Sequence, residues 1–344
     1  MTYQKIQVAR FGGPEELTLV EEQSLPAPVA GMVRIKVLAA GTGFTDTIIR
    51  KGKYPDYKGP LPYTPGYDLV GIVDALGPGV ETPKIGEMVA DMSVVGGYSQ
   101  YAVRPARGLV PVPAGLDPAE AVCIPLTFLT AWQMLTRFRK FQPNATVLMV
   151  GASGAVGTAL LVLARYLGLK VIGTAPRSAL PLVESLGATA VDYHGEDFVA
   201  EVRRLTNGKG VDAVFDAIGG SNWDRSFACL APGGILIGFG LQGAVAGTQS
   251  LLRSLFDLAK LTMLWNRFSF LFGGRRGAFY SIASRRRKRP AEFKADMSEL
   301  FELHKRGAIK PVIAEKLPLS AARAVHERID AEQVGGKIVL LPWA

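Results

Sequence analysis

The pattern of hydrophobic and polar positions changes about a third of the way along the 344-residue chain. From residue 3 to about residue 112, short runs alternate between apolar and polar side chains, as in 33–37, and Gly or Pro clusters separate the runs. Alternation with a period of two is typical of strands with one buried face, so this part predicts an all-β domain. From about residue 126, apolar runs alternate with segments of helical periodicity, which predicts βαβ units around a parallel sheet.

Five strands and four helices are predicted in this second part. The strands span residues 146–150, 170–174, 189–193, 211–216 and 234–239, and the helices span 155–167, 179–186, 197–206 and 223–230. Because crossovers between parallel strands are right-handed, these elements favour a doubly wound sheet. A helix over 321–329 and a final strand over 337–341 are also predicted, and this strand can return to the first domain.

Length and composition agree with two globular domains. A single core stops growing well before ~300 residues, and the chain is 48% hydrophobic and 20% charged. Its two cysteines, Cys123 and Cys229, lie among apolar residues and are predicted to be core residues rather than a disulfide. No apolar signal core opens the chain and no stretch reaches the ~18 apolar residues of a spanning helix, so a cytoplasmic location is expected.

The formal net charge of +9 is concentrated in places. Five basic residues stand together from Arg285 to Arg289. We expect a solvated loop there rather than a nucleic-acid site, because no aromatic ladder or recognised motif accompanies the charges. The preceding stretch, 251–272, is apolar and aromatic but is interrupted by four charged residues, Arg253, Asp257, Lys260 and Arg267. Three roles are open for it: lining a pocket, forming a subunit contact or lying on a membrane surface.

The strongest chemical signal is the glycine turn within 147–157, where a buried-type strand leads into an apolar helix. Gly154 lets the backbone approach a pyrophosphate, Gly157 lets the helix pack against the sheet, and the helix N-terminus offers free N–H groups to the anion. Ala152 stands where the strict G-x-G-x-x-G pattern has its first glycine, so the position between strand and helix carries the assignment. The predicted dinucleotide contacts here are Gly151, Ser153, Gly154, Ala155, Val156 and Gly157.

The end of the next predicted strand favours NADPH over NADH. A strand that binds NAD normally ends in Asp or Glu, which holds the ribose hydroxyls, whereas this one reads Thr174-Ala175-Pro176-Arg177. Arg177 can pair with a 2′-phosphate through two hydrogen bonds and a full charge, and the strand has no carboxylate to repel that phosphate. NADPH is therefore the expected cofactor, with Thr174 and Arg177 among its contacts.

Several motifs, in order along the chain, resemble the medium-chain dehydrogenase/reductase superfamily in its zinc-free quinone oxidoreductase (zeta-crystallin-like) branch. The resemblance covers nearly the whole sequence and is more specific than the glycine turn alone. Its motifs lie at residues 11–14, 39–41, 46, 49–54, 65–71, 129–131, 215–220 and 335–339. The fold class it implies is α/β, with a GroES-like β domain and a Rossmann domain that holds a doubly wound parallel sheet.

The resemblance also implies how the chain divides and which residues meet the cofactor. Residues 1–125 and 313–344 would form the GroES-like catalytic domain. Residues 126–312 would form the Rossmann NADP-binding domain, with an apolar and basic insert at about 242–292. Dimers are usual in the resembling family, so a homodimer is expected. Further cofactor contacts implied by matching positions are Thr130, Tyr193, Phe239, Gly240 and Lys337.

The same resemblance predicts a site without metal. Zinc-dependent alcohol dehydrogenases of this superfamily place Cys and His where this chain has Gly43 and Phe44, and another His where it has Tyr67. Zinc catalysis needs three protein ligands, and Gly43 and Tyr67 remove two of them. Gly43 also replaces an Asn that is common beside the substrate in the quinone oxidoreductase branch. The chain's histidines show no ligand spacing and are expected to be surface or packing residues: His194, His304 and His326.

Without a metal to polarise a simple ketone, the substrate must already be activated by conjugation. A quinone or an α,β-unsaturated carbonyl compound meets this requirement, and the protein would orient it and exclude water. Tyr54 is the candidate proton donor, because related enoyl reductases carry an active-site tyrosine at this place and a phenol with a pKa of ~10 stays protonated near neutrality. The resemblance adds Asp46 as a second catalytic candidate.

Two other functions are open from the sequence. An enoyl-thioester reductase would use the same hydride chemistry, and the basic cluster could then meet an acidic carrier. An NADPH-binding peripheral membrane protein with little catalysis would instead use the apolar stretch, and Arg285 to Arg289 would make weak contact with an anionic membrane surface.

Overall fold

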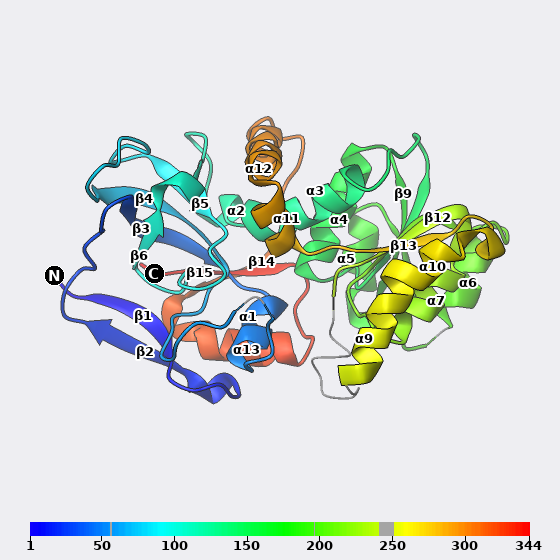
Figure 1. Cartoon of the computed structure of the whole chain (residues 1–344), viewed down its shortest axis with the longest axis horizontal. Helices are drawn as coiled ribbons and strands as arrows, with labels where there is room; N and C mark the ends of the chain where they lie inside the picture. Colours follow the sequence, from blue (N-terminus) through cyan, green and yellow to red (C-terminus); the bar gives the residue numbers. More distant parts are fainter. Residues whose placement is uncertain (56, 196, 241–250) are drawn as a thin grey trace. The chain divides into compact units, whose positions relative to one another are not determined.

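A computed structural model describes residues 1–55, 57–195, 197–240 and 251–344 of the chain. The chain divides into two compact units (Figure 1). Unit 1 comprises Met1–Leu129 together with Arg286–Ala344, and unit 2 comprises Thr130–Arg285. The boundaries predicted from the sequence are 125/126 and 312/313; the structure has them at 129/130 and 285/286, because helix α12, Pro290–Lys305, is part of unit 1.

Unit 1 is built on a seven-stranded sheet. Its strands follow the order β14-β15-β3-β4-β5-β7, and β6 pairs with β3 outside this path, while β1 and β2 form a separate ribbon. The strands are β1 (Tyr3–Val8), β2 (Leu17–Glu22), β3 (Met32–Gly41), β4 (Asp68–Leu76), β5 (Met88–Asp91), β6 (Tyr101–Pro105), β7 (Val110–Pro111), β14 (Ile313–Pro318) and β15 (Lys337–Leu341).

Strand β3 shows why the alternating sequence predicts this sheet. Its residues Val33, Ile35 and Val37 are fully buried, while the positions between them are partly exposed. These side chains pack with Leu69 and Val73 of the neighbouring strand β4 and form a core cluster. The predicted final strand is β15, which pairs antiparallel with β3 and parallel with β14. The return of the C-terminal strand to the first domain is therefore confirmed.

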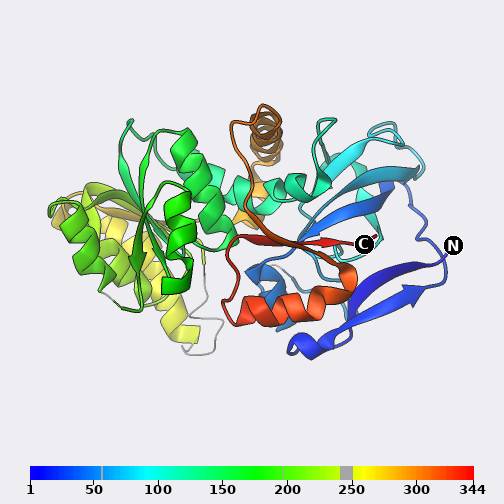
Figure 2. The same cartoon turned by 180° about the vertical axis from the view of Figure 1, so that it is seen from behind.

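Four helices complete unit 1, and two more cross its boundaries. Those of unit 1 are α1 (Phe44–Arg50), α2 (Pro118–Ala121), α12 (Pro290–Lys305) and α13 (Ala322–Asp330). Helix α3 (Leu129–Thr136) and helix α11 (Ile282–Lys288) span the two boundaries between the units. Helices α1 and α13, which are far apart in the sequence, lie side by side in both views (Figures 1 and 2).

Unit 2 is built on a six-stranded sheet in which all strands are parallel. The order β10-β9-β8-β11-β12-β13 corresponds to 3-2-1-4-5-6 in chain order, the arrangement of a dinucleotide-binding doubly wound sheet. Figure 1 shows α4 and α5 on one face of this sheet and α6 and α7 on the other. The elements are β8 (Thr146–Val150), α4 (Ala155–Tyr166), β9 (Lys170–Ala175), α5 (Leu180–Ser185), β10 (Thr189–Asp192), α6 (Phe198–Leu205), β11 (Val211–Asp216), α7 (Asn222–Ala228), β12 (Leu230–Gly238), α9 (Leu251–Ala259), α10 (Trp265–Arg267) and β13 (Arg276–Phe279).

Most of these elements agree with the sequence-based prediction, but one strand was missed. Strands β8 and β11 have the predicted bounds, and each end of the helices α4 to α7 lies within two residues of its predicted position. Strand β13 was not predicted, because Arg276-Gly277-Ala278-Phe279 is short and contains a glycine and no β-branched residue, so it gives no strand signal. This part of the expected insert at about 242–292 therefore belongs to the sheet. Residues 241–250 of the insert lie outside the described residues.

Two smaller expectations also have an outcome. Cys123 and Cys229 are both buried and unbridged, which confirms them as core residues. Among the described residues, no helix is both long enough and apolar enough to cross a bilayer.

Candidate functional site

The glycine turn of unit 2 joins the end of β8 to the start of α4. Gly151 has a φ of 84°, in the left-handed region that favours glycine. The turn is fixed to the neighbouring strand β9, because Gly151 N donates to Thr174 Oγ1 over 3.3 Å and Ala152 N donates to the Thr174 carbonyl oxygen over 2.8 Å. Thr174 is buried and fixes the turn through these two hydrogen bonds. Its hydroxyl therefore stabilises the turn even without a contact to a cofactor.

The glycines of this turn have different reasons to lack a side chain. A Cβ atom at Gly157 would overlap the Gly151 carbonyl oxygen and the Ala152 backbone, so α4 can pack on the turn only with glycine there. A Cβ atom at Gly154, the N-cap of α4, would meet only the Gly151 oxygen, at 3.6 Å. The protein itself therefore leaves open space at Gly154. A phosphate fits this space, where the first N–H groups of α4 are unpaired and the helix dipole is positive.

Four strand ends form one row across the sheet of unit 2. Thr174 of β9 pairs with Val150 of β8, Val150 pairs with Asp216 of β11, and Asp216 pairs with Gly238 of β12. The strand order reverses between β8 and β11, and open α/β sheets bind ligands outside the carboxyl ends of their strands at this position. The glycine turn, Thr174 and the residues after β12 therefore belong to one edge, as the sequence predicts for a dinucleotide site.

Asp216 organises the part of this edge that lies after β11. Its Oδ1 atom accepts hydrogen bonds from the backbone N–H groups of Ile218 and Gly219, and its Oδ2 atom accepts from Asn222 and Ser226. In the sequence, Asp216 stands out only as part of a motif, and no local signal indicates its structural role. A carboxylate with four donors holds the loop after β11 in one conformation.

The predicted pair Phe239-Gly240 follows β12 and is fixed against the same loop. The backbone N–H groups of both residues donate to the Asp216 carbonyl oxygen, over 3.0 and 3.4 Å. A Cβ atom at Gly240 would overlap the backbone of Ala217, so only glycine permits this close approach. The two residues therefore lie at the carboxyl edge, in the neighbourhood where the resemblance expects the nicotinamide.

Arg177 begins a short 3₁₀ turn after β9 and extends into solvent, with 85% of its side chain exposed. Its Nε atom pairs with Asp192 Oδ2 at 3.2 Å, and Asp192 ends the neighbouring strand β10. The Asp192 pKa is lowered, first by the hydrogen bond from His194 N and also by Arg177. The sequence analysis found no carboxylate at the end of its second strand, but the third strand supplies one. A 2′-phosphate at Arg177 must therefore compete with Asp192.

The remaining cofactor candidates lie in different surroundings. Tyr193 follows Asp192 and packs on His194, with ring centroids 4.3 Å apart. Thr130 is buried in the first turn of α3. Lys337 belongs to unit 1, where its Nζ atom forms a buried ion pair with Asp68 Oδ2 at 2.7 Å. The Lys337 ammonium thus has a partner within its own unit, and its contact with a cofactor stays a prediction.

The catalytic candidate Tyr54 meets a second tyrosine in unit 1. Its hydroxyl lies 2.8 Å from that of Tyr67, and the two rings are arranged edge to face. Tyr54 follows α1 and is partly exposed, whereas Tyr67 is fully buried immediately before β4. One hydroxyl of the pair donates its hydrogen to the other. If Tyr67 is the donor, the Tyr54 hydroxyl can donate to a further acceptor. The sequence analysis had placed Tyr67 only at a zinc-ligand position.

Asp46 is buried in the first turn of α1. Its Oδ2 atom accepts a hydrogen bond of 2.9 Å from the N–H group of Gly43, the residue that caps the helix. Burial and, next, the negative charge of Asp68 raise the Asp46 pKa, whereas Lys337 and the backbone N–H groups of Gly43 and Tyr67 lower it; the resulting pKa is about 7. Asp46 can therefore gain or lose a proton near neutral pH, and it also fixes the start of α1.

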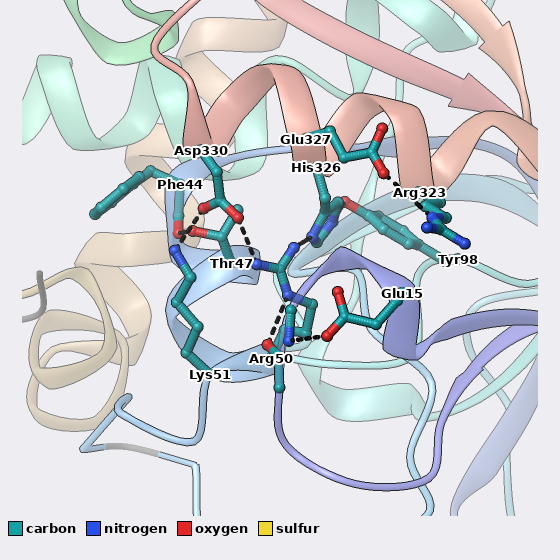
Figure 3. A network of polar contacts seen from close by, with 12 residues as sticks. Glu15, Phe44, Thr47, Arg50, Lys51, Tyr98, Arg323, His326, Glu327 and Asp330 are labelled. Atoms are coloured by element: carbon teal, nitrogen blue, oxygen red, sulfur yellow. Dashed lines mark hydrogen bonds and ion pairs between the residues drawn. The ribbon is translucent and has the colours of Figure 1, made fainter.

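A buried polar network holds the other end of α1 (Figure 3). Arg50 is fully buried; its Nη2 atom donates to Asp330 Oδ2 over 2.5 Å, and its Nη1 atom lies 3.0 Å from His326 Nδ1. Burial, followed by the charge of Arg50, lowers the His326 pKa to about 3, so the imidazole is neutral. Because Arg50 can only donate, Nδ1 accepts and the His326 Nε2–H group donates to the Tyr98 hydroxyl, 3.2 Å away. His326 is thus a buried packing residue.

The positions that would hold zinc carry other contacts. Gly43 caps α1 through its backbone, and the Tyr67 hydroxyl bonds Tyr54. Within the described part of the chain, no three His, Cys, Asp or Glu side chains are grouped so that they could hold a metal ion.

Unit 1 contains a GroES-like sheet, and unit 2 contains a Rossmann-like parallel sheet. Two family models match the chain: the alcohol dehydrogenase GroES-like domain over residues 29–114 and the zinc-binding dehydrogenase domain over residues 186–340. The quinone oxidoreductase of Rattus norvegicus is 32% identical over 340 residues, which cover 98% of this chain and 97% of the relative. The 2-haloacrylate reductase of a Burkholderia species is 32% identical over 343 residues and 98% of each chain.

A solved structure extends this similarity to three dimensions. The Escherichia coli quinone oxidoreductase, complexed with NADPH, has a TM-score of 0.86 and 29% identity to the chain, covering 98% of this chain and 100% of that one. The protein therefore belongs to the medium-chain dehydrogenase/reductase superfamily, in its quinone oxidoreductase branch, which confirms the resemblance and the fold class found in the sequence.

The different roles of the two glycines give a first testable prediction. Gly154→Ala should keep the thermal stability of the wild type, because its Cβ atom meets only an ordinary contact, but it should weaken NADPH binding at least tenfold by occupying the space for the phosphate. Gly157→Ala should lower the melting temperature, because the turn and α4 must separate. Thermal unfolding and fluorescence titration with NADPH measure both effects. Unchanged NADPH affinity in a folded Gly154→Ala variant would contradict the phosphate assignment.

The pKa of Asp46 gives a second prediction. An unfolded Asp titrates near ~4, whereas Asp46 titrates at about 7, so only the folded state holds this proton between the two values. Its contribution to stability is therefore complete at the acidic end of this window and is lost as the pH rises through about 7. Asp46→Asn removes the titration, so the free energy of unfolding of the variant relative to the wild type should increase with pH by at most about 1.4 kcal/mol per pH unit. Urea unfolding across the window measures this, and two parallel pH curves would refute it.

Proposed function

We propose that the protein reduces a quinone or an α,β-unsaturated carbonyl compound with NADPH, without zinc. The observation that carries this proposal is the hydrogen-bonded pair of Tyr54 and Tyr67 hydroxyls. Tyr67 occupies one of the positions where zinc-dependent relatives have a zinc ligand. Two relatives support the substrate class: one is named for quinones, and the other for 2-haloacrylate, which contains a conjugated carbon–carbon double bond.

The edge of the unit 2 sheet fits NADPH. Open space at Gly154, the N-terminus of α4 and the fixed turn at Gly151 would hold the pyrophosphate. Arg177 would hold the 2′-phosphate after exchanging its ion pair with Asp192. When bound, NADPH supplies the hydride. The protein supplies the binding edge, the orientation and the hydrogen-bond donors.

Tyr54 would complete the reduction at the oxygen of the substrate. Negative charge develops on the carbonyl oxygen of a conjugated substrate as its β-carbon or ring accepts a hydride, and a phenol can stabilise this charge by donating a hydrogen bond. If Tyr67 donates to the Tyr54 oxygen, the Tyr54 hydroxyl can donate to the substrate. Asp46 accepts a hydrogen bond from the N–H group of Gly43 at the N-cap of α1, so we assign Asp46 to the start of that helix.

Two expectations about the cellular state belong to the same proposal. We retain a cytoplasmic location and a homodimer as predictions from the sequence and the family. Light scattering of the purified protein measures the second of these.

Activity with a panel of acceptors tests the proposal. NADPH oxidation should be followed with a quinone, a simple enone, a crotonyl thioester and a primary aldehyde, using the wild type and Tyr54→Phe. We expect the wild type to turn over the quinone or the enone, and Tyr54→Phe to lower the enone kcat by roughly 10²- to 10⁴-fold. The loss is incomplete because binding and orientation remain.

Tyr57→Phe is the matched control for this experiment. Tyr57 lies in the same segment, but its hydroxyl donates to the Pro60 carbonyl oxygen, so its loss should leave kcat unchanged. Turnover of the aldehyde alone would overturn the assigned substrate class. An enone kcat that is equal in the wild type and Tyr54→Phe would exclude Tyr54 as the donor.

The cofactor preference depends on Arg177. Arg177→Ser should raise the KM for NADPH roughly tenfold or more and leave the KM for NADH unchanged, because a charged hydrogen bond contributes about 1.5–3 kcal/mol. Arg225→Ser is the matched control, since it removes another exposed arginine of unit 2 that pairs with an aspartate, Asp197 at 3.1 Å. Steady-state kinetics with both cofactors measures the split. Equal effects of Arg177→Ser on NADPH and NADH would refute the 2′-phosphate contact.

A further inference from the structure

Seven exposed apolar side chains in unit 2 lie within seventeen consecutive residues. We call them the apolar ridge: Phe256, Met263, Leu264, Phe268, Phe270, Leu271 and Phe272, with exposures from 39% to 72%. They lie in α9, in the π-helical turn Lys260–Leu264, directly after α10 and in the 3₁₀ turn Ser269–Phe272. Fifteen large hydrophobic residues are exposed in the described part of the chain, so almost half of them belong to this short stretch. Such a concentration is unusual for a surface that faces only water.

Buried side chains anchor the segment that carries the ridge to the rest of unit 2. Trp265 is buried and stacks on Phe227 of α7, with ring centroids 4.0 Å apart and an interplanar angle of 16°. Leu261 is fully buried, and the Asn266 side chain bonds both the N–H and the carbonyl group of Gly277 in β13. The segment therefore buries one set of side chains firmly while it presents the ridge to solvent.

The sequence segment that holds all of the ridge except Phe256 has charged residues of one sign, although its Lys260 pairs with Asp224 at 2.7 Å. Residues 258–291 contain nine Lys and Arg and no Asp or Glu. The whole chain has 39 basic and 30 acidic side chains, so without these nine the two signs are equal in number. Arg267 and Arg276 are exposed in this segment, and neither forms an ion pair or side-chain hydrogen bond with another described residue. The net positive charge of the protein is thus carried by the segment that contains most of the ridge.

The cluster from Arg285 to Arg289 is less available for contact with an anionic membrane surface than the sequence indicates. Arg286 pairs with Asp91 at 2.8 Å and also donates to the Met92 carbonyl oxygen. Arg285 lies over the ring of Phe138, 5.1 Å from its centroid. Part of this cluster is therefore committed to contacts within the protein.

We propose that the apolar ridge docks on an anionic lipid surface. Aromatic and leucine side chains enter the boundary between headgroups and acyl chains, while arginines beside them attract anionic headgroups. A two-fold contact between two copies of the ridge would bring equal positive charges together, because such an interface uses the same patch on both subunits. An anionic surface is complementary to both the apolar side chains and the charge. This inference does not depend on the proposed enzymatic function.

Cosedimentation of the full-length protein with lipid vesicles tests the proposal. We expect binding to vesicles of phosphatidylcholine and phosphatidylglycerol in equal amounts, and much weaker binding to phosphatidylcholine alone. High salt should weaken the binding because it screens the arginines. Phe270→Ser/Leu271→Ser should reduce vesicle binding at least tenfold. Arg267→Ser/Arg276→Ser should reduce it about fivefold for each arginine removed.

Two double variants of unit 1 are matched controls. Val29→Ser/Ile85→Ser removes side chains of similar exposure, 67% and 63% against 72% and 66% for Phe270 and Leu271. Arg306→Ser/Lys310→Ser removes two exposed charges outside the segment. Neither control should change vesicle binding. Circular dichroism and NADPH binding verify that each variant is folded.

Three results would overturn the proposal. The first is a wild type that does not sediment with either kind of vesicle. The second is equal loss of binding in the ridge variant and its Val29→Ser/Ile85→Ser control. The third is a wild-type oligomer that Phe270→Ser/Leu271→Ser converts to a monomer, since the ridge would then be a contact between copies of the chain.

Discussion

The buried ion pair between Lys337 and Asp68 is the interaction on which the architecture of unit 1 most depends. The two residues are far apart in the sequence, yet they begin β15 and β4, the strands on either side of β3. Both side chains are almost completely buried, and their charged atoms are 2.7 Å apart. Removal of one partner from such a pair typically costs about 3–5 kcal/mol, because it leaves an unpaired charge in the core. The pair therefore fixes the place where the C-terminal strand joins the sheet, and Gly41 of β3 has no room for a Cβ atom beside it.

The ion pair also determines the state of the neighbouring catalytic candidates. Burial raises the pKa of both Asp46 and Asp68, the negative charge of Asp68 adds to the shift at Asp46, and Lys337 opposes both shifts. The Asp46 pKa therefore lies near neutrality. Arg50 holds the opposite end of α1 through Asp330, so the helix is fixed at both ends. The loop that follows α1 then places the Tyr54 hydroxyl beside the hydroxyl of Tyr67.

Local sequence signals predicted most helices and strands, but they could not predict contacts between residues that are far apart in the sequence. Strand β8 and the glycine turn were found because a buried apolar run, a glycine turn and a helical period follow one another directly. Strand β13 gives no such signal, since its place at the sheet edge depends on contacts with Asn266 and β12. The Lys337–Asp68 pair joins two strands, and the Arg177–Asp192 pair joins the turn after β9 to the end of β10; no periodicity within one element indicates its partner. The tyrosine pair was half found, because Tyr67 was recognised only as the residue at a zinc-ligand position and not as a partner of Tyr54.

The distribution of charge separates two kinds of anion recognition in the same chain. Outside residues 258–291 the acidic and basic side chains are equal in number, so the dinucleotide edge cannot rely on a general positive field. Its attraction for phosphate must be local, from the N-terminus of α4 and from Arg177, and it acts over short distances. A surface attraction needs the reverse arrangement, with neighbouring cations whose fields add over about 10 Å in moderate salt. The segment that holds most of the ridge has nine basic and no acidic residues, and its Arg267 and Arg276 form no ion pair or side-chain hydrogen bond with another described residue. Salt should therefore affect the two kinds of binding differently, because a phosphate held by backbone N–H groups loses little to screening.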